Sequence, residues 1–316
     1  MAALPTLRQL EYAVAVADHR SFQRAARACH VTQPGLSAQS LQLESLLDAR
    51  LFERDRRNVW ITAAGEEVVR RARSVLGEVR GMVESAHGFK HPLRGLLRVG
   101  VIPTIAPYLF PQVLPRVRRR HPELRLALHE GRTAELVALL RRGELDLLVV
   151  ALEAPLDGLE QLALFQDPFL VALPAGHRLA KRRRLREGDL AGETILLLTE
   201  GHCLREQALA ACRARGADDI GDFRATSLTT LVEMVRGGEG VTLLPELTVP
   251  IEARRRDLAL VPLEPPAPFR TIGLAWRAAS GRAAEYALLG ESLSPGRRRP
   301  RGQVPATIAP IRRRTE

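Results

Sequence analysis

The segment EGHCLREQALAAC, residues 200–212, contains the side chains best suited to chemistry in this chain. It holds Cys203 and Cys212, two of the three cysteines among 316 residues, with His202 and Arg205 close to the first of them. A cysteine thiolate is a nucleophile and a metal ligand, whereas a buried thiol is a small apolar side chain. The segment therefore allows three interpretations, which are packing, metal binding and thiol redox chemistry.

The spacing of the two cysteines bears on all three interpretations. The sequence predicts a helix from about residue 203 to 214, on which nine residues separate the cysteines by about 13 Å along the axis. A disulfide needs Cα atoms within about 7 Å. Two packing cysteines would never meet, whereas a redox pair would have to unwind the helix, which couples oxidation to a conformational change. The spacing is not a usual zinc pattern, so no metal is expected.

Cys203 is placed where a thiolate is favoured. The first turn of a helix carries partial positive charge, and His202 and Arg205 add to it. A thiolate that attacks peroxide becomes a sulfenic acid, which a second thiol converts to a disulfide. In the redox interpretation Cys203 is the peroxidatic residue and Cys212 the resolving one. The third cysteine, Cys29, is expected to pack and to have no redox role.

Composition limits the class of protein. The few cysteines and the absence of an N-terminal apolar leader predict a cytosolic chain, and no window approaches the roughly 18 apolar residues of a membrane span. The net charge of +11 is concentrated in residues 296–316, which hold seven arginines and one glutamate. This segment is expected to be a disordered, solvated tail; a DNA-contacting arm is the alternative.

The first sixty residues predict a run of short helices. Thr6 and Gln9 form a capping box for the first helix, with Leu7, Leu10 and Val14 as its apolar stripe. Ser21 is a candidate cap for the second helix, in which Ala25 and Ala26 permit close packing.

Thr32 can cap a third helix, with Pro34 in its first turn and Leu36, Leu43, Leu46 and Leu47 as its core face. Two short helices joined by a tight turn are typical of a helix-turn-helix. Gln33 could then meet an adenine edge, and Ser37 a base or a phosphate.

This region resembles the winged helix-turn-helix of LysR-type transcriptional regulators. The residues that match the family pattern are Phe22, Ala25, Ala26, Gln33, Leu36, Ser37, Leu43, Glu44, Leu51, Phe52 and Arg54. The resemblance implies that Thr32, Gln33 and Ser37 contact the major groove and that Arg54, on the wing, contacts the backbone or minor groove. Ser40 and Asp48 depart from the pattern, because the family places a branched aliphatic residue and a helix-ending glycine there.

From Thr62 the pattern becomes that of one long helix. Apolar residues recur at alternating intervals of three and four, as in a coiled-coil seam: Val69, Ala72, Leu76, Val79, Val83 and Ala86. A helix lying on its own domain would also show a stripe. The regularity favours a linker helix that forms dimers, as the family resemblance also implies.

The rest of the chain alternates apolar runs with helical patterns. Strands are expected at 96–102, 124–129 and 145–152, around helices at 105–120 and 133–142, which predicts a parallel α/β unit. A second α/β set is expected from Pro168, and a strand at 270–276 with a closing helix at 282–291 would return to the first unit. Two lobes with two crossings resemble the periplasmic-binding-protein-like effector domain of LysR-type regulators, whose ligands bind in the cleft between the lobes.

The body most resembles that of peroxide-sensing LysR-type regulators. The matching segments are GVIPTIAPY (100–108), HEGRT (129–133), GHCLREQALAAC (201–212), FRATSLTTL (223–231) and RTIGL (270–274). The resemblance implies that Thr104, Thr133 and His202 hold peroxide beside Cys203, and that Arg270 supports the thiolate. Glu206 stands where these relatives carry aspartate, so its place in a proton relay is open.

We therefore expect a DNA-binding regulator that senses hydrogen peroxide through a reversible Cys203–Cys212 disulfide and controls oxidative-stress genes. Its domains would be a winged helix-turn-helix (1–61), a linker and dimerisation helix (62–91), a two-lobe α/β regulatory domain (92–295) and a basic tail (296–316). Expected partners are double-stranded DNA, hydrogen peroxide, further copies in a homodimer or homotetramer, a thiol reductant of the glutaredoxin or thioredoxin type, and RNA polymerase. No cofactor and no membrane partner are expected.

Two alternatives remain at this level. One is a regulator of the same architecture that senses a small metabolite and carries bystander thiols. The other is a thiol peroxidase, against which the N-terminal DNA-binding pattern argues. Other enzyme classes find little support, because the chain has no dinucleotide fingerprint, no phosphate-binding P-loop and no nucleophile elbow.

Overall fold

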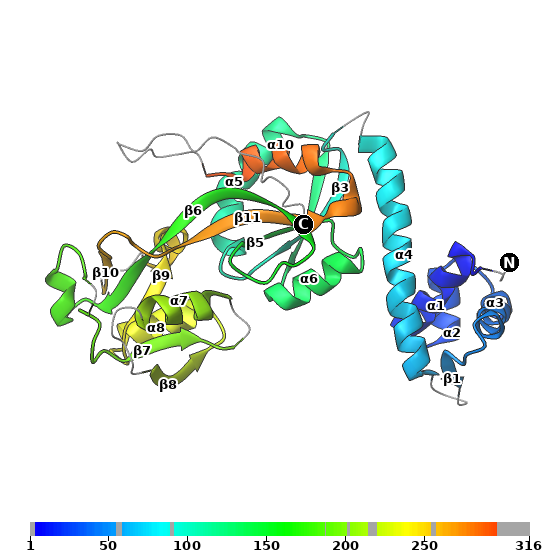
Figure 1. Ribbon diagram of the computed structural model, residues 1–316, viewed down its shortest axis with the longest axis horizontal. Helices are drawn as coiled ribbons and strands as arrows, with labels where there is room; N and C mark the ends of the chain where they lie inside the picture. Colours follow the sequence, from blue (N-terminus) through cyan, green and yellow to red (C-terminus); the bar gives the residue numbers. More distant parts are fainter. Residues whose placement is uncertain are drawn as a thin grey trace, which may run out of the picture.

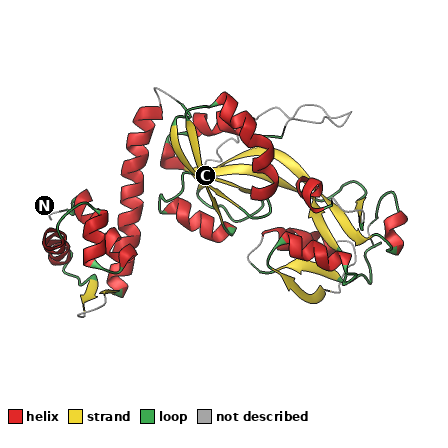
Figure 2. Ribbon diagram, turned by 180° about the vertical axis from the view of Figure 1, so that it is seen from behind, coloured by secondary structure: helices red, strands yellow, loops and turns green. Residues whose placement is uncertain are grey.

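The computed structural model of the chain is extended along one axis (Figure 1). A small helical unit with a long helix beside it lies at one end, and two α/β lobes follow toward the other (Figure 2). The structure describes residues 4–54, 59–88, 92–186, 188–200, 203–213, 220–253 and 257–295. His202 and the basic tail, on which predictions were made above, lie outside these residues.

The N-terminal unit is a winged helix-turn-helix, as predicted. Its elements are α1 (Leu7–His19), α2 (Phe22–Ala28), α3 (Gln33–Leu46), β1 (Phe52–Arg54) and β2 (Val59–Ile61). Thr6, Ser21 and Thr32 are the N-caps of the three helices, and Thr6 and Gln9 form the predicted reciprocal capping box. The two wing strands pair antiparallel.

The predicted core face of α1 is wrong. Leu7 is exposed and Leu10 and Val14 are only partly buried, whereas Tyr12, Ala13 and Val16 are buried. Helix α1 has apolar residues on more than one side, and its packing against α2, α3 and α4 selects the buried face. The apolar periodicity of the α1 sequence does not by itself show which of its faces is buried.

The long helix α4 (Ala63–Gly88) forms as predicted, but its apolar stripe is used differently. Val69, Ala72 and Leu76 are buried within a single chain, so the first half of the stripe is not an exposed dimer seam. Val79 is half-buried, and the side chains of Val83 and Ala86 lie outside the described ones. Among the described side chains of α4, the large apolar ones that are exposed are Val75 and Met82, at 43% and 67%.

The first lobe confirms the predicted α/β unit. It contains β3 (Gly95–Val101), α5 (Ala106–Arg120), β4 (Leu124–Glu130), α6 (Thr133–Arg141), β5 (Leu147–Ala151), η3 (Ala278–Ser280) and α10 (Ala283–Leu293). Strand β3 pairs in parallel with both β4 and β5. Helix α10 returns to pack on α5, so the end of the fold closes on the first lobe.

Two long antiparallel strands, β6 (Leu159–Pro174) and β11 (Phe269–Arg277), connect the lobes (Figure 1). Strand β10 (Leu258–Pro262) and strand β9 (Thr242–Pro245) both pair with β6. The sheet order is β10-β6-β11-β5-β3-β4, with β9 off this path, so the sheet is mixed rather than wholly parallel. Strand β6 begins at Leu159 and not near Pro168. Strand β10 (Leu258–Pro262) was not predicted.

The second lobe has its own apolar core. Its elements are η1 (Arg178–Lys181), β7 (Ile195–Leu198), α7 (Cys203–Arg213), β8 (Ile220–Ala225), α8 (Leu228–Arg236), β9 (Thr242–Pro245), η2 (Glu246–Thr248) and α9 (Val249–Glu252). Within the described part of the chain, no helix is both long and apolar enough to cross a membrane.

Candidate functional site

The two cysteines lie on one unbroken helix. Helix α7 begins at Cys203 and ends at Arg213, as predicted, so Cys203 starts its first turn and Cys212 stands near its end. Nine helical residues separate them by about 13 Å along the axis. Leu204 and Ala208 anchor α7 on the core of the second lobe. The side chains of both cysteines and all of His202 lie outside the described residues.

Arg270 is the centre of a buried polar cluster between the lobes. Its side chain is 0% exposed, and it lies on β11 directly opposite Asp167 of β6. Its Nε donates to Asp167 Oδ2 at 2.9 Å, while Nη1 and Nη2 donate to the hydroxyl and carbonyl oxygens of Thr104 at 2.8 and 3.0 Å. Asp167 compensates the buried positive charge, because a buried ion is tolerated only when it is paired.

Asp167 is a site residue that sequence reasoning missed. Its second carboxylate oxygen accepts the backbone N–H of Leu247 at 2.8 Å, so the carboxylate also holds the segment after β9. A signal was available, because Asp167 stands between the apolar segments 162–165 and 168–174 of one strand. Acidic side chains are almost never fully buried without a partner.

Thr104 and Thr133 lie where the sheet rule places them, after the carboxyl ends of the neighbouring parallel strands β3 and β4. Thr104 is 4% exposed and accepts a hydrogen bond from Arg270. Thr133 is 7% exposed, and its hydroxyl has no hydrogen-bond partner among the described residues. An unpaired buried hydroxyl costs about 1–3 kcal/mol, so this edge of the sheet is suited to a small polar ligand.

The structure does not bring Glu206 to the Arg270 cluster. The Glu206 side chain is 74% exposed, with its carboxylate 3.8 Å from Nε of Arg205. Arg205 is mostly buried and also donates to the carbonyl of Leu198 at 3.4 Å, which ties α7 to the end of β7.

Helix α7 is also tied to the first lobe. Gln207 Nε2 donates to Glu153 at 3.1 Å, and the other oxygen of Glu153 accepts the backbone N–H of Thr271 on β11 at 2.6 Å. Neither Gln207 nor Glu153 was predicted, because each has the composition of an ordinary surface position. A change in α7 would therefore be transmitted to β11, one of the two strands that connect the lobes.

The residues predicted to contact the major groove lie at the start of α3. Thr32 caps the helix and accepts the N–H of Gly35 at 3.4 Å, Gln33 is exposed, and Ser37 lies one turn further along and is partly exposed. Arg54 ends strand β1, and its side chain lies outside the described ones. Helix α3 is bound to the wing by Glu44, which accepts the N–H groups of Leu51 and Phe52 at 2.7 and 3.1 Å.

Both departures from the family pattern have structural consequences. Asp48 adopts a positive φ of 46°, a conformation that favours glycine. Ser40 is buried in α3, and its hydroxyl has no partner among the described residues.

Cys29 is partly buried, and desolvation, with the charge of Glu11, raises the pKa of its thiol. This keeps it protonated and supports a packing role.

Replacing Ser40 by alanine is expected to stabilise the N-terminal domain. The change removes an unpaired buried hydroxyl and should raise the free energy of unfolding by about 1 kcal/mol, measured by urea denaturation. Ser45→Ala is the matched control, because Ser45 is exposed on the same helix. It gains only helix propensity, about 0.5 kcal/mol. Equal gains for the two variants would mean that the Ser40 hydroxyl is satisfied.

Comparisons with known proteins agree with this architecture. Residues 7–66 match the model of the bacterial regulatory helix-turn-helix protein, lysR family, and residues 90–294 match the LysR substrate binding domain. The chain is 44% identical over 287 residues to the DNA-binding transcriptional dual regulator OxyR of Escherichia coli K12, covering 91% of this chain and 94% of that one. It is 42% identical over 295 residues to a probable hydrogen peroxide-inducible genes activator of Mycobacterium avium, covering 92% and 95%.

Solved structures give the same result. A full-length OxyR variant from Pseudomonas aeruginosa superposes with a TM-score of 0.77 at 36% identity, covering 92% of this chain and 95% of that one. A cysteine-to-serine OxyR variant from Corynebacterium glutamicum with bound hydrogen peroxide gives 0.64 at 35% identity, covering 93% of each chain. With both family models matched in order along nearly its whole length, the chain belongs to the LysR family of bacterial transcriptional regulators.

Proposed function

We propose that this protein is a DNA-binding transcription regulator that senses hydrogen peroxide through a reversible disulfide between Cys203 and Cys212 and controls oxidative-stress genes. The observation that carries the proposal is that both cysteines lie on one continuous helix that is tied to both lobes. The names of the relatives in Escherichia coli and Mycobacterium avium support it. In this role the chain acts as a regulator and not as an enzyme.

The two thiols supply both of the electrons that reduce one molecule of peroxide, so the proposed reaction needs no other reductant. The Cys203 thiolate attacks one peroxide oxygen, the O–O bond breaks, and the departing hydroxide takes up a proton as water. The Cys212 thiol then attacks the sulfenic sulfur, which forms the disulfide and releases a second water. Two thiols are oxidised and one peroxide is reduced. The position of Cys203 at the start of α7 favours its thiolate.

Peroxide is held at the edge of the sheet by Thr104, Thr133 and His202 in this proposal. The Thr104 hydroxyl accepts from Arg270, so its own proton is directed elsewhere and can be donated to peroxide. The Thr133 hydroxyl is buried and unpaired, which leaves it available to the same ligand. Arg270 supports the thiolate by orienting Thr104, whereas Glu206 is exposed beside Arg205 and has no contact with this cluster among the described residues.

The signal is mechanical in this proposal. Cysteines about 13 Å apart on a helix must approach to within about 7 Å, so the disulfide requires α7 to unwind. Unwinding breaks the helical backbone that positions Arg205 and Gln207, and with it the ties to β7 and to the crossing strands. Each lobe can then repack against neighbouring subunits.

The remaining assignments follow from the family. We infer the domains 1–61, 62–91, 92–295 and 296–316 described above, and a homodimer or homotetramer in the cytoplasm. Helix α3 would enter the major groove with Thr32, Gln33 and Ser37, and Arg54 would contact the backbone or minor groove. The exposed Val75 and Met82 are candidate dimer contacts on α4. A thiol reductant of the glutaredoxin or thioredoxin type would reset the disulfide, and RNA polymerase is a further partner.

Peptide mapping of the pre-reduced protein after one equivalent of hydrogen peroxide tests the proposal. We expect a peptide that links Cys203 to Cys212, forms within seconds to minutes and disappears with added thiol. Cys203→Ser should abolish the crosslink and the change in DNA footprint but keep DNA binding, whereas Cys29→Ala should change neither. Two free thiols after treatment, or a footprint that still responds in Cys203→Ser, would refute it and favour a metabolite sensor.

A further inference from the structure

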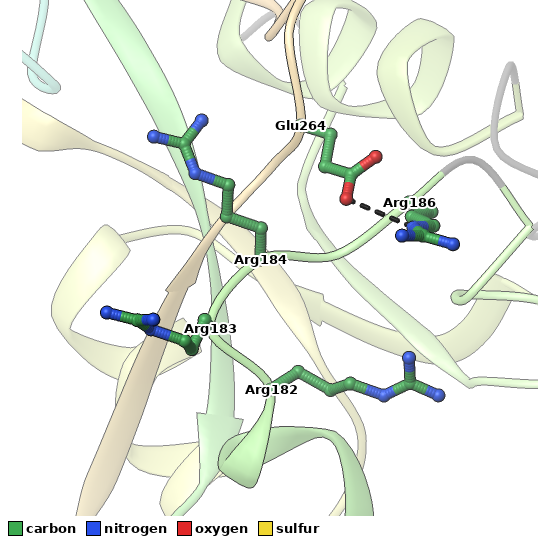
Figure 3. A pocket seen from close by; sticks show the side chains of 5 residues that line it. All are labelled: Arg182, Arg183, Arg184, Arg186 and Glu264. Atoms are coloured by element: carbon green, nitrogen blue, oxygen red, sulfur yellow. Dashed lines mark hydrogen bonds and ion pairs between the residues drawn. The ribbon is translucent and has the colours of Figure 1, made fainter.

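A cluster of arginines lines an open cavity at the far end of the second lobe. The arginine cradle, as we call it, consists of Arg182, Arg183, Arg184 and Arg186 with Glu264 opposite, around a volume of about 450 Å³ (Figure 3). All four arginines are exposed. They belong to the segment between η1 and β7, which the proposed redox chemistry does not use.

The backbone under the arginine cradle is fixed. Leu179 and Leu185, on either side of the arginine triplet, are both buried in the lobe core. Leu185 forms a parallel bridge with Leu263: its N–H donates to Pro262 O at 2.9 Å, and its carbonyl accepts from Glu264 N at 2.9 Å. The arginine side chains therefore project from a short backbone segment that is anchored on both sides, and Glu264 is held opposite Arg186.

The charge in the arginine cradle is only partly compensated. Arg186 pairs with Glu264, with Nε 3.0 Å from Oε1. No ion-pair partner of Arg182, Arg183 or Arg184 occurs among the residues that the structure describes. Figure 3 shows these three side chains extending in different directions from one short segment, so their positive charges are spread over a surface that an extended polyanion can contact at several points.

The lining of the cavity indicates the kind of anion. Guanidinium groups present a planar fork of donors that matches phosphate oxygens in pairs. Among the described residues only arginine and glutamate line the cavity, so none of them offers an apolar or aromatic side chain to hold a nucleobase. We propose that the arginine cradle binds a condensed phosphate chain, supplied either as inorganic polyphosphate or as the phosphate moiety of a nucleotide.

The position of the arginine cradle argues against the DNA that the reading head binds. The cradle adjoins the end of β10, whereas α3 lies at the opposite end of the long axis of the chain, with α4 and the first lobe between them (Figure 1). The arginine cradle and helix α3 of one chain therefore face different regions of space. The inference is independent of the peroxide chemistry and is tested on reduced protein.

Titration calorimetry on the full-length reduced protein, with tripolyphosphate, ATP and inorganic phosphate as probes, tests this proposal. The test variant is Arg183→Gln/Arg184→Gln. The control is Arg118→Gln/Arg119→Gln, which removes the same charge from the exposed end of α5. Both keep the seven arginines of residues 296–316, so the tail contributes equally. We expect the Kd for tripolyphosphate to rise about tenfold or more in the test variant only.

The probes also distinguish the source of the phosphate chain. Equal affinity for ATP and tripolyphosphate, both lost in the test variant, would support recognition of the chain alone. Preference for tripolyphosphate would identify inorganic polyphosphate, and preference for ATP a nucleotide. Equal loss in the two variants would show that binding follows net charge and would overturn the proposal. Tighter binding of random duplex DNA, lost only in the test variant, would also overturn it.

Discussion

Replacing Arg270 by methionine should lower the free energy of unfolding by about 3–5 kcal/mol, because it leaves the Asp167 carboxylate buried without its partner. The change also removes both hydrogen bonds to Thr104. Denaturation in urea, followed by circular dichroism, measures the loss. Since Arg270 joins β11 to β6 and to the end of β3, the destabilisation should appear in both lobes and not in the helix-turn-helix.

A double-mutant cycle separates the ion pair from simple loss of volume. Asp167→Leu combined with Arg270→Met replaces the pair by apolar side chains, which typically costs less than breaking it. The double variant should therefore be more stable than the sum of the single changes predicts. Arg186→Met is the matched control, because its pair with Glu264 is exposed and should contribute little to the free energy of unfolding. Strict additivity in the cycle would show that Arg270 and Asp167 are not coupled.

The parts of the fold that the sequence predicted are those with local signals. Apolar runs and helical patterns correctly placed β3, β4, β5 and the helices around them, and capping residues correctly placed the starts of α1, α2 and α3. Strand β10 and the first half of β6 were missed, because each is stabilised by antiparallel pairing with strands distant in the sequence. The buried face of α1 was wrong for a related reason, since packing against α4 selects between its two apolar sides.

The candidate site likewise has features that the sequence predicted and features that it did not. The helix that carries both cysteines was predicted from its periodicity, and Thr104 and Thr133 from their positions after parallel strands. The full burial of Arg270 was not predictable, since its partner Asp167 lies 103 residues away in sequence. The contact between Gln207 and Glu153 is likewise a product of how the lobes meet. Residue types and spacing thus indicate a redox pair, whereas its connection to both lobes requires the structure.

Weakening helix α7 should make the Cys203–Cys212 disulfide harder to reduce. The helix exists in the reduced form, whereas a disulfide across nine helical residues requires it to open, so a helix-destabilising change acts on one form only. Ala210→Gly costs about 1 kcal/mol and Ala210→Pro about 3 kcal/mol in a helix interior. At about 30 mV per 1.4 kcal/mol, the midpoint potential should fall by about 20 mV for glycine and about 65 mV for proline.

These potentials are measured by equilibrating the protein in graded thiol–disulfide buffers, alkylating the free thiols and determining the reduced fraction by mass spectrometry. Ala287→Gly is the control, because Ala287 is exposed in the middle of α10, which is present in both redox forms. Its cost in stability should be similar, and its effect on the potential close to zero. The order wild type, glycine, proline matters more than either value, since a graded fall follows only if α7 opens on oxidation. Unchanged potentials in both Ala210 variants would mean that the pair closes without unwinding the helix, and the mechanical part of the proposal would then fail while the thiol chemistry could stand.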